Sequence, residues 1–305
     1  MNDQARKLAE GVQPQTVLDS EFAISEWHDT EAVMSQLDAL LAQPVRTIRR
    51  KNMDKVLQWF TDNCRKSKAL ADQAAAVIPG GVQHNLAFNY PYPLAITEAN
   101  GAHMTDVDGN CYIDFLQAGG PTLLGSNPEA VRNKIKELLD NCGPTTGLLH
   151  DYEVKLAELV CRHMPAVDML RMLGSGTEGV MAAIRVARAH TGKKWIIKMG
   201  GGYHGWSDQM VYGMRVPGTG RRDAVGIPRA STSKIHESFP HDLAALRRKL
   251  QFNRLSGGTA AVIVEPLGPE SGTRPIHKSF NEELRKLCDE FGTLLIFDEV
   301  VTGFR

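Results

Sequence analysis

The stretch that decides the fold runs from Met169 to Met199 and reads MLRMLGSGTEGVMAAIRVARAHTGKKWIIKM. A short apolar run, Met169–Leu173, meets the glycine-rich turn Gly174–Gly179, and an amphipathic segment then leads to a second apolar run, Trp195–Met199. Strand, tight turn, helix and strand in this order are typical of a βαβ unit. We therefore predict a parallel sheet whose strands are connected by helices.

The same alternation continues downstream. Apolar runs at Ala260–Val264 and Leu294–Phe297 predict further strands, and helices are predicted at residues 178–190, 241–250 and 281–290. Strands that are apolar throughout are typical of sheets covered by helices on both faces. We predict an α/β fold with a mostly parallel sheet, in which the ligand binds beyond the C-terminal ends of the strands.

Three parts are predicted along the chain: an N-terminal helical extension (1–50), the N-terminal part of a small domain (51–125) and a large domain (126–305). The extension carries one helix, residues 30–43, with Thr30 as its N-cap. The small-domain part contains a long helix, residues 53–77, and a β-hairpin that turns at Asp106–Asn110. Asn127 and Asp151 are expected to begin the first two helices of the large domain.

The composition limits the classes of function. Lys and Arg number 35, and so do Asp and Glu, so the chain lacks the basic excess typical of nucleic-acid binding. The five cysteines are scattered without a CxxC pair, which indicates reduced thiols. No signal-peptide pattern opens the chain, and no apolar run approaches the ~18 residues of a membrane span. We expect a cytoplasmic protein without nucleic-acid or membrane partners.

The turn Gly174–Gly179 spells G-x-G-x-x-G, a pattern found at dinucleotide sites. A dinucleotide site requires an acidic residue about 20 positions on, at the end of the next strand. The first acidic residue after the turn is instead Asp208, in a loop. Ser175 and Thr177 place hydroxyl groups at a helix N-terminus, which suits a terminal phosphate monoester. The residues favour the monoester, and a dinucleotide or a turn without a ligand stay as alternatives.

Tyr203 and His204 follow the run Trp195–Met199 and are flanked by glycines on both sides. Glycines let the backbone pass close to a flat group, and an aromatic side chain can stack on it. A structural histidine is the alternative for His204. The position of the pair at a strand end favours ring binding.

Asp298 ends the apolar run Leu294–Phe297, where a carboxylate needs a cation or hydrogen-bond donors. The partner is either an arginine such as Arg305 or the protonated ring nitrogen of a heteroaromatic ligand. Glu265 ends another predicted strand in the same way and is expected to line the same crevice. No metal site is predicted, because no HExxH run is present and Pro240 separates His236 from His241.

Together these runs resemble the class III pyridoxal-phosphate aminotransferases, and most of all their glutamate-1-semialdehyde aminomutase branch. The resemblance covers about residues 52–305. It rests on Ile78–Val82, Asp108–Asn110, Ser175–Glu178, Tyr203–Gly205, Glu265-Pro266, Asp298–Val300 and Thr302–Arg305. It implies the type I fold of pyridoxal-phosphate enzymes, pyridoxal 5'-phosphate as cofactor, small-molecule amino donors and acceptors, and a homodimer.

The resemblance also implies the roles of the site residues. The cofactor phosphate is held by Ser175, Gly176 and Thr177. Tyr203 lies against one face of the ring with His204 beside it, and Val300 packs on the other face. Asp298 is the catalytic residue in this set, because it pairs with the pyridine nitrogen and keeps the ring an electron sink.

The Schiff-base lysine of the family lies a few tens of residues beyond the run that ends at Arg305. Lys193, Lys194 and Lys198 lie near the second strand, where we expect solvated or capping roles. We therefore expect an incomplete aminotransferase or aminomutase that is inactive as a 305-residue chain. Transfer between molecules and transfer within one are both compatible with these residues. The alternatives are a catalytically inactive phosphate-ligand binder or partner subunit and a nicotinamide-dependent oxidoreductase.

Overall fold

The computed structural model describes residues 29–142, 147–214, 220 and 222–304. Its centre is a four-stranded parallel sheet with the spatial order β5-β4-β6-β7. The strands are β4 (Trp195–Met199), β5 (Ile235–Ser238), β6 (Thr259–Val264) and β7 (Leu294–Phe297). Every residue of the two inner strands, β4 and β6, is buried. The predicted parallel sheet is confirmed, and β5 is an additional strand.

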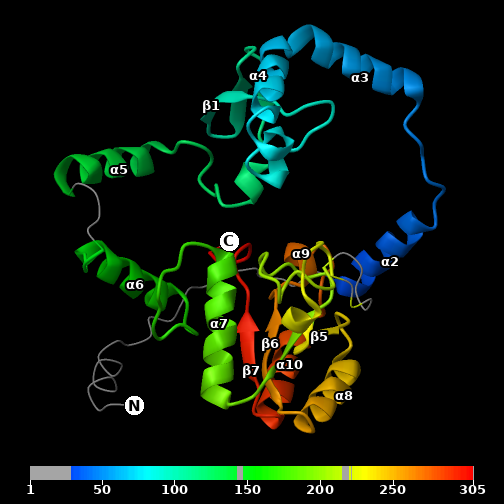
Figure 1. Cartoon of the computed structure of the whole chain (residues 1–305), viewed down its shortest axis with the longest axis vertical. Coiled ribbons are helices and arrows are strands. Elements are labelled where there is room, and N and C mark those ends of the chain that lie inside the picture. The colour runs from blue at the N-terminus through cyan, green and yellow to red at the C-terminus, as the bar shows by residue number, and fades with distance from the viewer. Residues whose placement is uncertain (1–28, 143–146, 215–219, 221, 305) are drawn as a thin grey trace.

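Helices cover both faces of this sheet (Figure 1). They are α7 (Gly176–Thr191) on one face and α8 (Leu243–Arg254) with α10 (Phe280–Glu290) on the other. Ile196 of β4 packs in one core with Ile184 of α7, whereas Ile197 packs in the other core with Leu246 of α8. Successive strand residues point to opposite faces, so one apolar run supplies both cores.

The predicted strand Met169–Leu173 is wrong, because this segment pairs with no strand among the described residues. Met169 and Met172 are 89% and 66% exposed. A strand is stabilised by hydrogen bonds and side-chain contacts with its neighbours, so an apolar run without a neighbour gains neither. In the described part of the chain β7 forms one edge of the sheet and is paired only with β6.

The upper lobe in Figure 1 contains two helices and an antiparallel sheet of order β1-β2-β3. Its elements are α3 (Arg50–Asn63), α4 (Arg65–Ala75), β1 (Ile96–Asn100), β2 (His103–Asp106) and β3 (Cys111–Ile113). The predicted hairpin is confirmed, but the predicted helix over residues 53–77 is two helices that meet at Cys64. Asp108 of the hairpin turn explains the break, because its carboxylate accepts from the N–H groups of Lys66 and Ser67 at the start of α4.

The remaining helices are α2 (Thr30–Leu41), α5 (Glu129–Cys142), α6 (Asp151–His163) and α9 (Pro269–Gly272), with short 3₁₀ turns at Pro79–Gly81, Asn85–Ala87, Gln117–Gly119 and Arg229–Thr232. The N-cap of α2 is Asp29, whose side chain accepts from Ala32, and not Thr30 as predicted. Residues 1–28 of the predicted extension lie outside the described residues. The three-part division of the chain stays a prediction. Within the described ranges we find no helix long and apolar enough to cross a membrane.

Candidate functional site

Three runs that are far apart in the sequence meet at the C-terminal ends of the parallel strands. They are the start of α7, the loop of residues 200–213 that follows β4 (the glycine loop), and the end of β7. The N–H of Trp206 in the glycine loop donates to Oγ1 of Thr177 at 3.3 Å, which joins the first two runs. His204 joins the glycine loop to Asp298, the residue that follows β7. The structure therefore places the residues of all three runs at one site.

His204 and Asp298 form the buried centre of this site. A hydrogen bond of 2.8 Å joins Nδ1 of His204 to Oδ2 of Asp298, and the two side chains are 0% and 6% exposed. The other carboxylate oxygen, Oδ1, accepts from the N–H of Val300 at 3.1 Å. Each oxygen keeps a second lone pair that a ring N–H can use. Arg305, the alternative partner of Asp298, lies outside the described residues.

The start of α7 has the chemistry of an anion site. Ser175 is the N-cap, and its Oγ accepts from the N–H of Glu178 at 3.2 Å. The carboxylate of Glu178 is turned back onto the N–H of Gly174, at 2.6 Å. The first turn of a helix presents N–H groups that have no intrahelical acceptor, together with the positive end of the helix dipole. Ser175, Gly176 and Thr177 could therefore hold a phosphate.

Two glycines keep the runs in close contact. A methyl group on Gly176 would come within 2.7 Å of Cγ2 of Val300. A methyl group on Gly205 would come within 2.6 Å of Oγ1 of Thr177, and Gly205 also has a φ of +88°, which disfavours any other residue. At both positions the glycine backbone therefore lies closer to the neighbouring run than a larger residue would allow.

The surfaces that a flat ring requires are accessible. The side chains of Tyr203 and Val300 are 56% and 64% exposed, although their neighbours His204 and Asp298 are buried. A phosphorylated heteroaromatic cofactor with a protonated ring nitrogen needs an anion site for its phosphate, apolar surfaces for its ring and a carboxylate for its nitrogen. The residues present fit that group.

Glu265, the residue that follows β6, supports the site. Its Oε1 accepts from the N–H of Tyr203 at 3.2 Å and from the N–H of Glu270 at 3.1 Å. It is 8% exposed. The carboxylate therefore fixes the backbone at which the aromatic pair begins.

The prediction of a solvated or capping role is wrong for Lys198, whose side chain is completely buried. It is right for Lys193, whose Nζ donates to the carbonyls of Phe291 and Gly292 at the opposite end of the sheet. Sequence reasoning missed that Lys198 is buried and bonded to backbone carbonyls of the glycine loop. The available signal was a single lysine inside the apolar strand that leads directly into the glycine loop.

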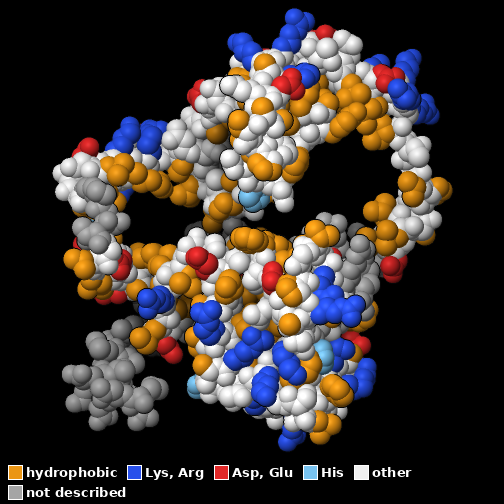
Figure 2. Space-filling view, in the orientation of Figure 1, with side chains coloured by type: hydrophobic (Ala, Val, Ile, Leu, Met, Phe, Trp, Pro, Cys, Tyr) orange, Lys and Arg blue, Asp and Glu red, His pale blue; other side chains and the backbone are white. Residues whose placement is uncertain are grey.

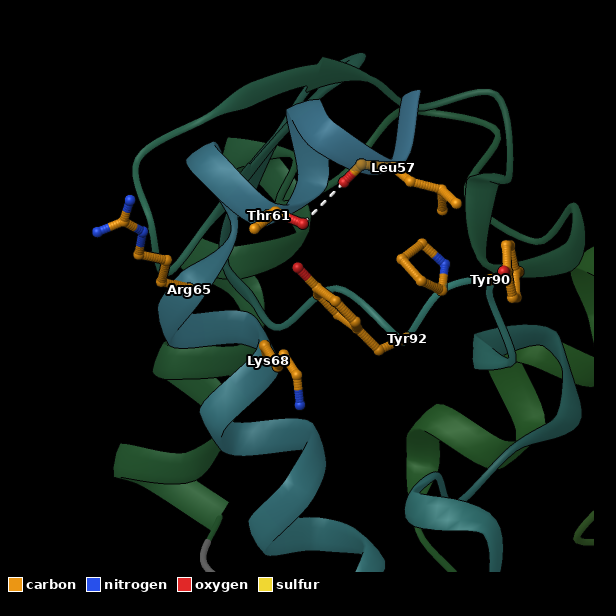
Figure 3. A pocket seen from close by; sticks show the side chains of 7 residues that line it. Leu57, Thr61, Arg65, Lys68, Tyr90 and Tyr92 are labelled. Atoms are coloured by element: carbon orange, nitrogen blue, oxygen red, sulfur yellow. Dashed lines mark hydrogen bonds between the residues drawn. The ribbon is translucent and has the colours of Figure 1, made fainter. Parts of the chain in front are cut away.

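A separate hollow lies in the upper lobe between α3, α4 and the segment Tyr90–Tyr92 (Figure 3). Arg65 and Lys68 are among its lining residues, and Lys68 is paired with Asp72. None of the residues predicted to bind the cofactor lines this hollow. It is distinct from the site at the strand ends.

The sheet, the helix N-terminus and the buried carboxylate belong to an α/β fold that resembles a transaminase with pyridoxal phosphate bound (TM-score 0.71, 30% identity, 78% and 55% of the two chains). The family model for class III aminotransferases matches residues 86–305. The chain belongs to the class III aminotransferase family.

Its relatives include aminomutases and transaminases. The chain is 42% identical over 245 residues to glutamate-1-semialdehyde 2,1-aminomutase 1 of Lachnoclostridium phytofermentans, covering 79% of this chain and 57% of that protein. The structure resembles an omega-transaminase from Sphaerobacter thermophilus (TM-score 0.73, 29% identity, 80% and 57% of the two chains). It also resembles a β-phenylalanine aminotransferase from Variovorax paradoxus (TM-score 0.71, 29% identity, 83% and 55% of the two chains). The chain thus spans little more than half the length of these relatives.

Proposed function

We propose that this chain is the cofactor-binding part of an enzyme that transfers an amino group between small molecules or within one. The aminomutase and transaminase relatives support this class of reaction. The observation that carries the proposal is the buried pair His204–Asp298 beside the N-terminus of α7. A carboxylate and a phosphate site at the same strand ends match the two ends of pyridoxal 5'-phosphate.

Each site residue has a proposed role in binding. The hydroxyl groups of Ser175 and Thr177 and the backbone of Gly176 hold the phosphate. The exposed side chains of Tyr203 and Val300 contact the two faces of the ring. Asp298 keeps the pyridine nitrogen protonated, and His204 orients its carboxylate. The bound cofactor supplies the electron sink of the reaction.

We further propose that the 305 residues bind the cofactor without completing turnover. Covalent capture of the aldehyde needs a lysine amine that is accessible at the site. Lys198 lies on the strand that leads into the site, but its side chain is buried and its Nζ is bonded to three backbone carbonyls. It is therefore not available for that step.

A binding titration tests the proposal. Pyridoxamine phosphate is the probe, because it lacks the aldehyde and so reports the noncovalent site alone. Trp206 is 77% exposed and adjoins the aromatic pair through the glycine loop, so its fluorescence should respond to a bound ring. We expect saturable quenching by pyridoxamine phosphate and none by reduced nicotinamide dinucleotides. The reverse result would favour the nicotinamide-dependent oxidoreductase and overturn the proposal.

A homodimer is part of the proposal. Large apolar side chains are exposed over the upper lobe and along the segments beside it (Figure 2). Phe115, Leu124 and Leu149 are 90%, 73% and 80% exposed. Exposed apolar area on this scale is typical of surfaces that a partner covers. Light scattering after size exclusion should give twice the mass of the chain, and a monomer at micromolar concentration would contradict this part.

A further inference from the structure

Lys198 is a charged residue buried in β4, whose other residues are apolar. It lies on β4 two positions before the glycine loop, and its side chain is 0% exposed. Burial of an ammonium group away from water is costly unless its charge and all its protons find partners. The structure shows which partners Lys198 has.

The three protons of Lys198 have three acceptors. Its Nζ donates to the carbonyl oxygens of Gly202 at 2.9 Å, Met210 at 3.1 Å and Tyr212 at 2.9 Å. An ammonium group has three donors, so its hydrogen-bonding capacity is fully used. Gly202 lies near the start of the glycine loop, whereas Met210 and Tyr212 lie near its end. One ammonium group therefore joins the two ends of the loop that presents Tyr203 and His204.

The peptide group between Gly202 and Tyr203 is held on both sides. Its carbonyl accepts from Lys198 at 2.9 Å, and its N–H donates to Oε1 of Glu265 at 3.2 Å. A peptide group is planar, so two bonds on opposite sides determine its orientation. That orientation sets the direction in which the backbone enters the aromatic pair.

The carboxylates around Lys198 offset part of the cost of burial. Glu237 is its neighbour on β5, and Asp223 and Glu265 also raise its pKa by their charge. Burial is the larger effect and lowers the pKa of Lys198 to about 8. Burial of this ammonium group costs free energy, and all three of its N–H groups donate to carbonyls of the glycine loop. We therefore infer that Lys198 holds the backbone of that loop in place.

We propose that Lys198 is a positioning residue for cofactor binding, which holds the glycine loop so that Tyr203 can contact the ring and His204 can reach Asp298. This inference rests on the proposed function. It assigns to a lysine within the chain a role that differs from covalent attachment of the cofactor.

Lys193 offers a matched control. Its Nζ also donates to two backbone carbonyls, those of Phe291 and Gly292, but at the N-terminal end of the same strand. Lys198→Met and Lys193→Met each remove an ammonium group from backbone carbonyls. We expect both variants to melt at a lower temperature. Only Lys198→Met should weaken pyridoxamine phosphate binding, by about 10- to 100-fold. Lys198→Gln keeps part of the donor set and should lie between Lys198→Met and the unaltered protein.

Hydrogen exchange, compared with Lys193→Met, separates local loosening of the glycine loop from a general loss of stability. Without ligand, the amides of residues 200–213 should exchange faster in Lys198→Met and Lys198→Gln than in Lys193→Met. Equal affinity in folded Lys198→Met would overturn the inference. So would failure of both Lys198 variants to fold while Lys193→Met folds, because Lys198 would then be a general structural residue. If the unaltered protein does not bind pyridoxamine phosphate, the proposed function itself fails.

Discussion

Nδ1 of His204 lies 2.8 Å from Oδ2 of Asp298, although the two residues are 94 positions apart in the chain. One follows β4 and the other follows β7, and β6 lies between these strands. The bond therefore crosses the C-terminal end of β6, and both side chains are buried. In the proposed function, a carboxylate fixed in this way binds a cationic ring nitrogen without a further change of its own orientation.

Replacement of Asp298 by Asn tests this role. Asn keeps the shape but removes the charge that favours a protonated ring nitrogen. The nitrogen of bound pyridoxamine phosphate should lose its proton about 1–3 pH units lower in the variant. Its absorption, followed across pH, measures the change. Asp289→Asn on α10, where the carboxylate is paired with Arg285, is the control and should change nothing. An unaltered titration in Asp298→Asn would remove the assigned role.

Thr177→Val tests the phosphate site. The variant roughly keeps the volume but removes a hydroxyl group that also accepts from the N–H of Trp206. Loss of a hydrogen bond to a charged group costs about 1.5–3 kcal/mol, so affinity for pyridoxamine phosphate should fall roughly 10- to 100-fold. Thr191→Val is the control at the other end of α7, where Oγ1 donates to the carbonyl of Ala187. Equal affinities in the two variants would exclude Thr177 from the proposed phosphate site.

Gly205→Ala tests the close approach of the glycine loop to α7. Gly192 provides the comparison, because it has a φ of +66° but no atom within 4 Å of an added methyl group. Alanine in the left-handed region costs about 1–2 kcal/mol at either position. Only at Gly205 does the methyl group also meet Thr177. Thermal melts should show a lower melting temperature for both Gly205→Ala and Gly192→Ala. A fluorescence titration with pyridoxamine phosphate should show weaker binding in Gly205→Ala alone.

The lowered pKa of Lys198 predicts the sign of a pH effect on stability. Its pKa is about 8 in the folded protein and 10.5 for an ordinary lysine. Between these values the unfolded chain binds more protons, so the free energy of unfolding rises with pH. The stability of the unaltered protein relative to Lys198→Met should therefore increase from pH 8 to 10.5, by up to about 3 kcal/mol. Denaturant melts at several pH values measure this difference, and a decrease would contradict the lowered pKa of Lys198.

Reduction with borohydride tests the availability of the lysines. After incubation with pyridoxal phosphate, the 305-residue chain should yield no stoichiometric adduct at a single lysine. Lys198 is enclosed by carbonyls, and an exposed lysine such as Lys194 should react only in part and without selectivity. Peptide mass mapping would locate any adduct. A single stoichiometric adduct on Lys198 would contradict both its proposed role and the proposed binding mode.

Much of the fold follows from local patterns. The strands β4 and β7 begin and end where the apolar runs predict, and α6 begins at Asp151 as expected. The family resemblance also located the three runs that meet at the site. These features are accessible from sequence because strand alternation, helix periodicity and capping depend on residues close together in the chain.

Other features were decided by contacts between distant segments. Met169–Leu173 has the composition of a strand but no neighbour to pair with, whereas Ile235–Ser238 is a strand because β4 lies beside it. The pairing of His204 with Asp298 and the peptide group held between Lys198 and Glu265 likewise depend on the order of strands in the sheet. The sequence by itself thus determined the family and most of the strands and helices that carry the three runs, whereas the roles of the site residues stay predictions. Only the tertiary structure decided which residues of these runs are in contact and that Lys198 is buried beside the glycine loop. Hydrogen bonds between strands and the burial of a charge depend on groups that the chain brings together only when it folds.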